Sequence, residues 1–320
     1  MRTRRSQSSS DPVSSTHPRE AAHRTVLLHE AIEQLAIQKD DVVVDATLGG
    51  AGHAKAIAEK LGAKGVLVGF DLDSDAIERT GDALEGAKPK VHLVAANFRN
   101  LAVEVQKLGL AKIDKVLFDL GWSSYQLDAG RGFSFLRDEP LSMTYANPAQ
   151  PSALTAEKIV NEWAEQSIAD VIYGWGEERY SRRIAKTIVE HRAKMPFRTS
   201  AQLAEVIKAA VPSVYRYGRL HPATRTFQAL RIAVNDELGA LKEGLRGAWE
   251  MLARDGRIAV VSFHSIEDRL VKQTFLAWEK GGSGERITKK PQTPTPEEIL
   301  RNPRARSAKL RIIQKVVHRT

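Results

Sequence analysis

Hydrophobic residues in the first third of the chain gather in short runs that alternate with amphipathic stretches. The run Val42–Val44 is short, β-branched and continuous, as is typical of a strand buried on both faces of a parallel sheet. The same unit recurs at Val66–Phe70, Val91–Val94 and Val116–Phe118. Apolar residues at helical spacing precede and separate them over Val26–Ile37, Ala54–Leu61, Asp75–Leu84 and Leu101–Leu108. This alternation predicts an α/β fold with a doubly wound parallel sheet, which binds ligands beyond the carboxyl ends of its strands.

The next strand pattern, Arg257–Ser262, comes far later than the dozen or few dozen residues that one crossover needs. The interval has helical patterns broken by prolines, over Thr155–Glu165, Gly176–Ala193, Ser200–Ala210 and Thr226–Glu250. We therefore expect an inserted helical domain at about residues 130–220, with residues 226–250 returning to the sheet as a helix. Leu310–Val317 is predicted to be the last strand and Gly281–Arg306 a proline-rich loop.

Charge is distributed unevenly along the chain, whose formal net charge is +9. Residues 1–24, 179–225 and 286–320 carry net charges of +3, +9 and +8, which leaves −11 for the remainder. Separate basic surfaces on an acidic body suit a polyanion such as nucleic acid, because each neutralised phosphate releases counterions. Solvated helix faces and a disordered tail explain the same charges without a partner.

Composition excludes several classes of protein. The chain has no cysteine, which rules out disulfides, thiolate zinc sites and a cysteine nucleophile. No apolar run approaches the roughly 20 residues of a membrane span, and Met1–Glu20 lacks the hydrophobic core of a signal peptide. We expect residues 1–22 to form a disordered basic leader and the protein to be cytoplasmic, with no membrane partner.

A glycine-rich turn, Asp45–His53, lies directly between the first predicted strand and a helix. Glycines let a ligand approach the backbone, and the following helix N-terminus supplies N–H donors, although a tight turn alone would also need them. The turn lacks the third glycine of a dinucleotide fingerprint and the Gly-Lys-Ser/Thr of a P-loop, and Asp45 would repel a pyrophosphate. A positively charged donor without phosphate, S-adenosylmethionine, is favoured.

Three further strand ends carry candidate site residues. Asp71 ends the second strand, where a carboxylate can accept both ribose hydroxyls, although surface acids are also common there. Phe98 follows the third strand and is a candidate for stacking on adenine or an ordinary core residue. Asp119 ends the fourth strand, where this architecture places the reacting group, and a buried acid there needs a partner or a function.

The absence of cysteine also restricts the methyl acceptor. Methylation of cytosine C5 usually needs a cysteine that attacks C6, so exocyclic amines and hydroxyls remain. An exocyclic amine needs a hydrogen-bond acceptor, a stacking surface and in-line geometry, for which we consider Asp119 with Trp122 or Tyr125. The residues after Asp119 are Leu-Gly-Trp and not the Pro-Pro-aromatic run of DNA amino-methyltransferases, which disfavours that subclass.

Two later segments contain clustered polar residues. Ser262–Arg269 follows the fifth strand, where His264 and Glu267 are too few for a metal site and a helix cap is the simpler explanation. His221–Arg231 offers the guanidinium groups of Arg225 and Arg231 at the predicted domain junction, a chemistry suited to phosphates. We expect residues 179–225 to form part of an RNA surface, and we expect no metal ligands.

Together these stretches closely resemble the bacterial small-subunit rRNA cytosine-N4 methyltransferases of the MraW or RsmH type. The similarity spans about residues 23–317, and the strings HPATRTFQALR and SFHS-x-EDR are highly specific. The matching segments are Thr25–Glu30, Asp45–His53, Asp119–Asp128, Arg131–Phe135, Gly176–Arg179, His221–Leu238, Ser262–Arg269 and Asn302–Ser307.

The resemblance implies a class I, Rossmann-like methyltransferase domain formed by residues 23–129 and 221–320, with an inserted helical substrate-recognition domain at 130–220. It implies S-adenosylmethionine as donor and a decoding-region cytosine of 16S rRNA as acceptor, within the small ribosomal subunit. The cofactor contacts that it implies fall on Ala51, Gly52, His53, Asp71, Phe98, Asp119 and Gln126.

The chain departs from the family pattern at several positions near the acceptor. Ala51 replaces a usual glycine, Trp122 a valine and Tyr125 a proline, and in Pro140–Ala146 three charged residues are replaced by Ser142, Thr144 and Ala146. Two other functions remain open at this point: a class I methyltransferase acting on another nucleic acid or on protein, and a catalytically silent RNA-binding assembly protein.

Overall fold

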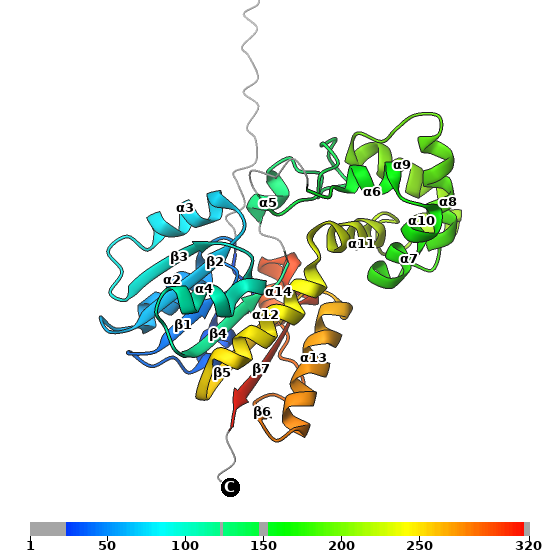
Figure 1. The fold of residues 1–320 in the computed structure, drawn as a ribbon. Coiled ribbons are helices and arrows are strands. Elements are labelled where there is room, and N and C mark those ends of the chain that lie inside the picture. Colours follow the sequence, from blue (N-terminus) through cyan, green and yellow to red (C-terminus); the bar gives the residue numbers. More distant parts are fainter. Residues whose placement is uncertain (1–23, 122–123, 147–152, 317–320) are drawn as a thin grey trace, which may run out of the picture.

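A seven-stranded mixed sheet in the order β3-β2-β1-β4-β5-β7-β6 organises the protein. The computed structural model describes residues 24–121, 124–146 and 153–316 (Figure 1). The strands are β1 (Val42–Asp45), β2 (Val66–Asp71), β3 (Lys90–Ala95), β4 (Ile113–Asp119), β5 (Leu252–Ser262), β6 (Gly284–Arg286) and β7 (Lys309–Lys315). The strand predictions at residues 42–119 are confirmed. The runs in β1, β2 and β4 are mostly buried, whereas β3 forms the edge of the sheet and its run is only half-buried.

The order of the strands reverses beside β1: β2 and β3 follow on one side of it, and β4 and β5 on the other. Strand β1 pairs in parallel with β2 on one side and β4 on the other, and β4 pairs in parallel with β5. Only β7 runs antiparallel, between β5 and β6. The carboxyl ends of β1, β2 and β4 therefore meet at the switch point where doubly wound sheets bind ligands.

Helices cover both faces of the sheet. Residues of α1 and α2 pack with one face in a hydrophobic cluster, and residues of α4, α12 and α13 pack with the other in a second cluster. The helices of this part are α1 (Leu28–Leu35), α2 (Gly52–Lys60), α3 (Ser74–Ala83), η1 (Phe98–Asn100), α4 (Leu101–Lys107), α12 (Glu237–Met251), α13 (Ser265–Lys280), α14 (Pro296–Arg301) and η2 (Pro303–Ser307). The α/β fold with helices on both faces is thus the one that the alternation predicted.

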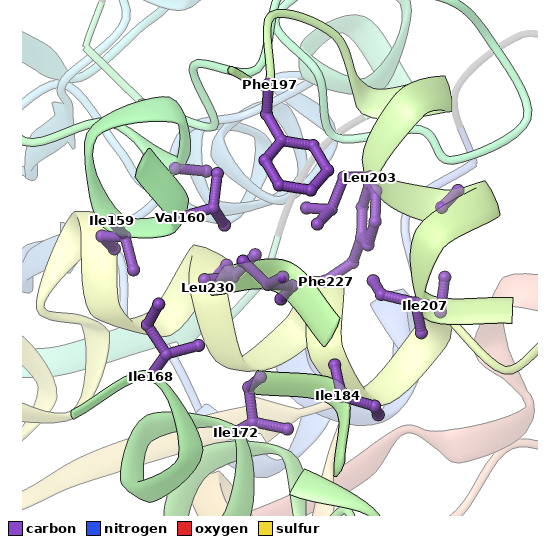
Figure 2. Close-up of a cluster of buried hydrophobic side chains, with 14 of the residues drawn as sticks. Ile159, Val160, Ile168, Ile172, Ile184, Phe197, Leu203, Ile207, Phe227 and Leu230 are labelled. Atoms are coloured by element: carbon purple, nitrogen blue, oxygen red, sulfur yellow. The ribbon is translucent and has the colours of Figure 1, made fainter. Parts of the chain in front are cut away.

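A helical region is inserted between β4 and β5 (Figure 1). It has its own hydrophobic core, in which Ile172, Ile184 and Ile207 come from three different helices (Figure 2). That core continues onto Phe227 and Leu230. The helices are α5 (Ser124–Asp128), α6 (Ala156–Glu162), α7 (Glu165–Gly176), α8 (Ser181–Arg192), α9 (Ser200–Ala210), α10 (Ser213–Arg216) and α11 (Thr224–Asn235).

Some element boundaries predicted from the sequence are wrong. The predicted helix 226–250 is two helices, α11 and α12, because Asp236 adopts a left-handed conformation with φ 46°. Likewise, Glu177 at φ 51° ends α7 four residues before α8 begins, where the sequence pattern favoured one helix from Gly176. The predicted loop 281–306 contains β6, α14 and most of η2.

The segments at the two ends of the described chain pack together. The Leu27 amide donates to Glu298 Oε1 at 2.8 Å, and Asn302 Nδ2 donates to the Arg24 carbonyl at 3.1 Å. The predicted leader, residues 1–22, lies outside the described residues. Within the described ranges, no helix is long and apolar enough to cross a membrane.

Candidate active site

A cavity of about 1360 Å³ opens at the carboxyl ends of β1, β2 and β4. The sheet contributes Asp71 and Asp119 to its wall, and the inserted region contributes Phe133 and Tyr145. Six of the seven predicted cofactor contacts line it: Gly52, His53, Asp71, Phe98, Asp119 and Gln126. The seventh, Ala51, is buried in the turn just behind the wall.

The glycine turn has the backbone shape that its sequence suggested. Gly49 and Ala51 both lie in the left-handed region, with φ of 49° and 64°. An alanine at such a position costs roughly 1–2 kcal/mol relative to a right-handed conformation, so the usual glycine would be less strained here. Gly52 begins α2, and a Cβ atom on it would lie 1.8 Å from Thr25 Oγ1. The turn therefore packs tightly under the N-terminal segment.

Asp45, His53 and Asp119 form a buried group behind and along the cavity wall. His53 Nδ1 lies 3.3 Å from Asp119 Oδ2, and the Asp119 amide donates to Thr47 Oγ1 at 2.7 Å. Asp45 is 0% exposed and accepts the Thr47 amide at 3.1 Å. Burial raises the pKa of the Asp45 carboxyl to about 7, against the opposing attraction of His53.

Three polar atoms of this group have no hydrogen-bond partner among the described residues. They are Asp45 Oδ2, His53 Nε2 and Asp119 Oδ1. Leaving a buried polar atom unpaired costs about 1–3 kcal/mol, so such atoms call for a ligand or a function. The carboxylates of Asp45, Asp71 and Asp119 lie close enough to raise the pKa of Asp45 by mutual repulsion. The site therefore favours a cationic ligand and disfavours a phosphate.

Asp71 is oriented by the backbone around it. Its Oδ2 accepts the Gly49 amide and its Oδ1 the Asp73 amide, both at 2.9 Å. Burial raises the pKa of this carboxyl, and the two amides oppose that effect. Each oxygen keeps a second lone pair, so the carboxylate can still accept ligand hydroxyls.

Phe98 is a core residue that also lines the cavity. Its ring packs edge-to-face on Phe118, with centroids 5.5 Å apart, and lies so close to α12 that a Cβ on Gly244 would meet it at 2.7 Å. It also lines the cavity. The contact with Phe118 thus fixes the position of the Phe98 ring at the cavity wall.

Of the two aromatic residues considered for stacking, Trp122 lies outside the described residues. Tyr125 lines the cavity and is 45% exposed, and the Arg79 guanidinium lies 4.3 Å from its ring centroid. One face of the Tyr125 ring is thus covered by a cation.

Sequence reasoning missed an aromatic wall on the inserted side of the cavity. Phe133 stacks on Tyr145 with centroids 5.7 Å apart, and Phe135 stacks on His221 at 4.5 Å. Phe227 meets Phe135 edge-to-face. The segment Arg131–Phe135 was noted only as part of the family resemblance, since its aromatic residues converge with α11 only in the folded chain. This wall has the surface that a planar base requires.

The prediction that Arg231 is available to phosphates is wrong. Arg231 is only 8% exposed, and its Nε and Nη2 atoms donate to the two Glu237 oxygens at 2.8 and 2.9 Å. Burial favours this paired form, because an unpaired guanidinium would lose its hydration without compensation. Arg225 stays at the junction, where it donates to the Glu177 carbonyl.

The helix-cap interpretation of Ser262–Arg269 is confirmed. His264 caps α13 and forms a capping box with Glu267. Glu237 joins these two residues, so that three possible metal ligands lie within 4.8 Å of one another. However, Glu237 already pairs with Arg231, and Glu267 accepts the Phe263 and His264 amides. Internal pairs account for this cluster.

Similarity to known proteins agrees with this geometry. The chain is 46% identical over 310 residues to a ribosomal RNA small subunit methyltransferase H of Brevibacillus brevis, covering 92% of this chain and 98% of the relative. It is 47% identical over 311 residues to the Heliobacterium modesticaldum protein of the same name, with the same coverage. The family model described as the MraW methylase family matches residues 20–316, and the chain therefore belongs to that family.

Proposed function

We propose that this protein transfers a methyl group from S-adenosylmethionine to N4 of a cytosine in the decoding region of 16S rRNA. Family membership supports the methyl transfer, and the names of the relatives support small-subunit rRNA as substrate. The observation that carries the choice of an amine is Asp119, a carboxylate on the cavity wall with one buried, unpaired oxygen. An rRNA substrate in turn implies work in the cytoplasm, on the small ribosomal subunit.

The donor fits the sheet side of the cavity. S-adenosylmethionine, when bound, supplies a methyl group activated by a sulfonium charge. Asp45, Asp71 and Asp119 provide the negative surroundings that this charge needs, and the Gly49–Gly52 turn lets the ligand approach the backbone. Asp71 would accept the ribose hydroxyls and Phe98 would contact the adenine.

The acceptor fits the inserted side. A cytosine amine shares its lone pair with the ring, so transfer requires a group that accepts an N–H and directs the lone pair toward the methyl. Asp119 Oδ1 would accept this N–H. The residue is oriented by His53, whose Nδ1 lies 3.3 Å from Asp119 Oδ2, and by the Thr47 hydroxyl, which accepts the Asp119 amide. The chain has no cysteine to attack C6, which excludes the usual route to C5.

Asp71→Ala is expected to weaken donor binding by roughly 1–3 kcal/mol, because it removes charge-assisted hydrogen bonds. Isothermal titration calorimetry with S-adenosylmethionine measures this directly. Circular dichroism must show that the variant is folded, since Asp71 also holds the Gly49 amide. Unchanged affinity in a folded variant would remove Asp71 from the donor site.

Donor affinity is expected to rise with pH between about 5.5 and 7.5, by roughly three- to tenfold. The pKa of Asp45, raised to about 7 by burial, falls when a cation binds nearby, so binding releases a proton and is favoured at higher pH. Titrations at several pH values measure the slope.

The matched variant for this measurement is Asp45→Asn, which should flatten the pH dependence. Burial lowers the pKa of His53, but Asp119 and Asp45 raise it more. A bound cation would lower this pKa too, so His53 also makes donor affinity rise with pH. Asp45→Asn keeps this contribution in part. The neutral product S-adenosylhomocysteine should show a smaller slope than the donor. Equal slopes in the parent and the variant would show that Asp45 does not sense the ligand.

The basic part of the insert is the proposed RNA surface, with Arg231 now excluded because it is buried in an ion pair. To test the function, labelled methyl transfer is measured with small subunits that lack the modification, with naked rRNA, and with donor alone. Transfer to subunits or rRNA supports the proposal. Donor binding with transfer only to other acceptors would favour another class I methyltransferase, and subunit binding without donor binding would favour a silent assembly protein.

A further inference from the structure

The C-terminal segment, residues 286–316, contributes to the lining of the cavity. Arg301 at the end of α14 and Arg304 in η2 line the cavity together with Arg24 from the other end of the described chain. All three side chains are exposed. We call them the rim arginines. The inference that follows rests on the proposed function and extends it to the way in which the substrate is held.

The rim is fixed to the methyltransferase core. Glu298 accepts the Leu27 amide, and Asn302 donates to the Arg24 carbonyl. Ala305 and Ala308 are buried in the same hydrophobic cluster as α1 and α2. The arginines on this segment are therefore held at a defined distance from the glycine turn, as a binding residue requires.

The other cations of this segment are mostly used inside the protein. Arg286 pairs with Glu279, while Lys309 and Arg311 both pair with Asp268. Lys315 donates to the carbonyls of two core residues. In contrast, Arg24 and Arg301 form no ion pair within residues 24–121, 124–146 and 153–316. Their charge is available to an anion from outside.

The charge of the cavity wall and the position of the rim arginines indicate which anion they bind. The cavity wall is acidic at Asp71 and Asp119, which disfavours an anion beside these two residues. A nucleotide whose base reaches Asp119 keeps its two phosphodiesters outside, at the mouth through which the base entered. Guanidinium groups bind phosphate oxygens in a forked, charge-assisted geometry.

We infer that the rim arginines bind the phosphodiesters that flank the target cytosine and so hold its base in the cavity. The carboxylate of the donor is the other anion that could reach this rim, and the test separates the two. Arg24 and Arg301 are exposed to solvent, where a phosphodiester that stays outside the cavity can reach them.

The test uses the full-length double variant Arg24→Gln/Arg301→Gln and small subunits that lack the modification. We expect KM for subunits and the subunit Kd from filter binding to rise tenfold or more, with kcat within about threefold of the parent. The slope of log K for subunit binding against log salt is negative, and its magnitude should decrease by about 1.4. The variant loses two phosphate contacts, and each contact to single-stranded nucleic acid contributes about 0.7. The donor Kd should stay within twofold.

The matched control is Lys289→Gln/Lys290→Gln, which removes the same charge from exposed residues of the same segment that do not line the cavity. It should change KM by less than about threefold. Three results would overturn the inference: an unchanged subunit Kd in the rim variant, an equal loss in the control, or a tenfold loss of donor affinity. A parent protein that binds subunits but transfers no methyl would contradict the proposed function, while the Kd comparison would still test the rim.

Discussion

Asp119→Asn is expected to keep the fold and to lower the rate of methyl transfer by a factor on the order of a hundred or more. The substitution preserves shape but removes the charge that faces the donor and weakens the acceptor for the amine N–H. The unpaired Oδ1 atom is the group affected, because Oδ2 is already beside His53. Single-turnover transfer to undermethylated small subunits measures the chemical step apart from binding.

Asp75→Asn is the matched control for this experiment. Asp75 also lines the cavity, at the start of α3, but it lies outside the His53 and Thr47 contacts that position Asp119. We expect it to change the transfer rate by less than about tenfold. A parent rate in Asp119→Asn, or an equal loss in both variants, would show that Asp119 has no particular role in the chemistry.

Glu237→Gln is expected to lower the free energy of unfolding by about 3–5 kcal/mol, because it leaves the Arg231 guanidinium buried without its counter-charge. Both side chains are only 10% exposed, and Tyr145 also donates to Glu237, at 3.0 Å. Urea denaturation followed by circular dichroism measures the change. The pair joins the inserted region to α12, so its loss should destabilise both parts of the molecule.

An exposed pair provides the comparison. Lys186 and Glu190 lie 3.8 Å apart on the surface of α8, and Glu190→Gln should cost less than about 1 kcal/mol. The double substitution Arg231→Met/Glu237→Leu should recover part of the stability lost in Glu237→Gln, since neither charge is then buried alone. If Glu237→Gln is no more destabilising than Glu190→Gln, the buried pair does not stabilise this junction.

The sheet and the part of the cavity that the sheet lines could be predicted because their signals are local. Runs such as Val42–Val44 are continuous only where a strand is buried on both faces, and three of the four runs are followed directly by an aspartate. Asp45, Asp71 and Asp119 were found in this way. The glycine turn was also visible, since its conformations are ones that few other residues adopt.

The part of the cavity that the inserted region lines depends on contacts between distant segments, and the sequence carries no local sign of them. The aromatic wall forms only when Phe135 meets His221, and the Glu237 pair removes Arg231 from the candidate phosphate ligands. The break at Asp236 was missed because apolar residues continue at helical spacing on both sides of it. Tertiary packing, and not local propensity, decided these features.

The location of the transferred methyl tests the central claim most directly. Small subunits lacking the modification are incubated with the protein and labelled donor, and their rRNA is digested to nucleosides and analysed by mass spectrometry against standards. An acceptor amine held by Asp119 predicts that the label is in N4-methylcytidine from the decoding region, and that Asp119→Asn greatly reduces this product. Label on a ring carbon or on a ribose oxygen would contradict the account.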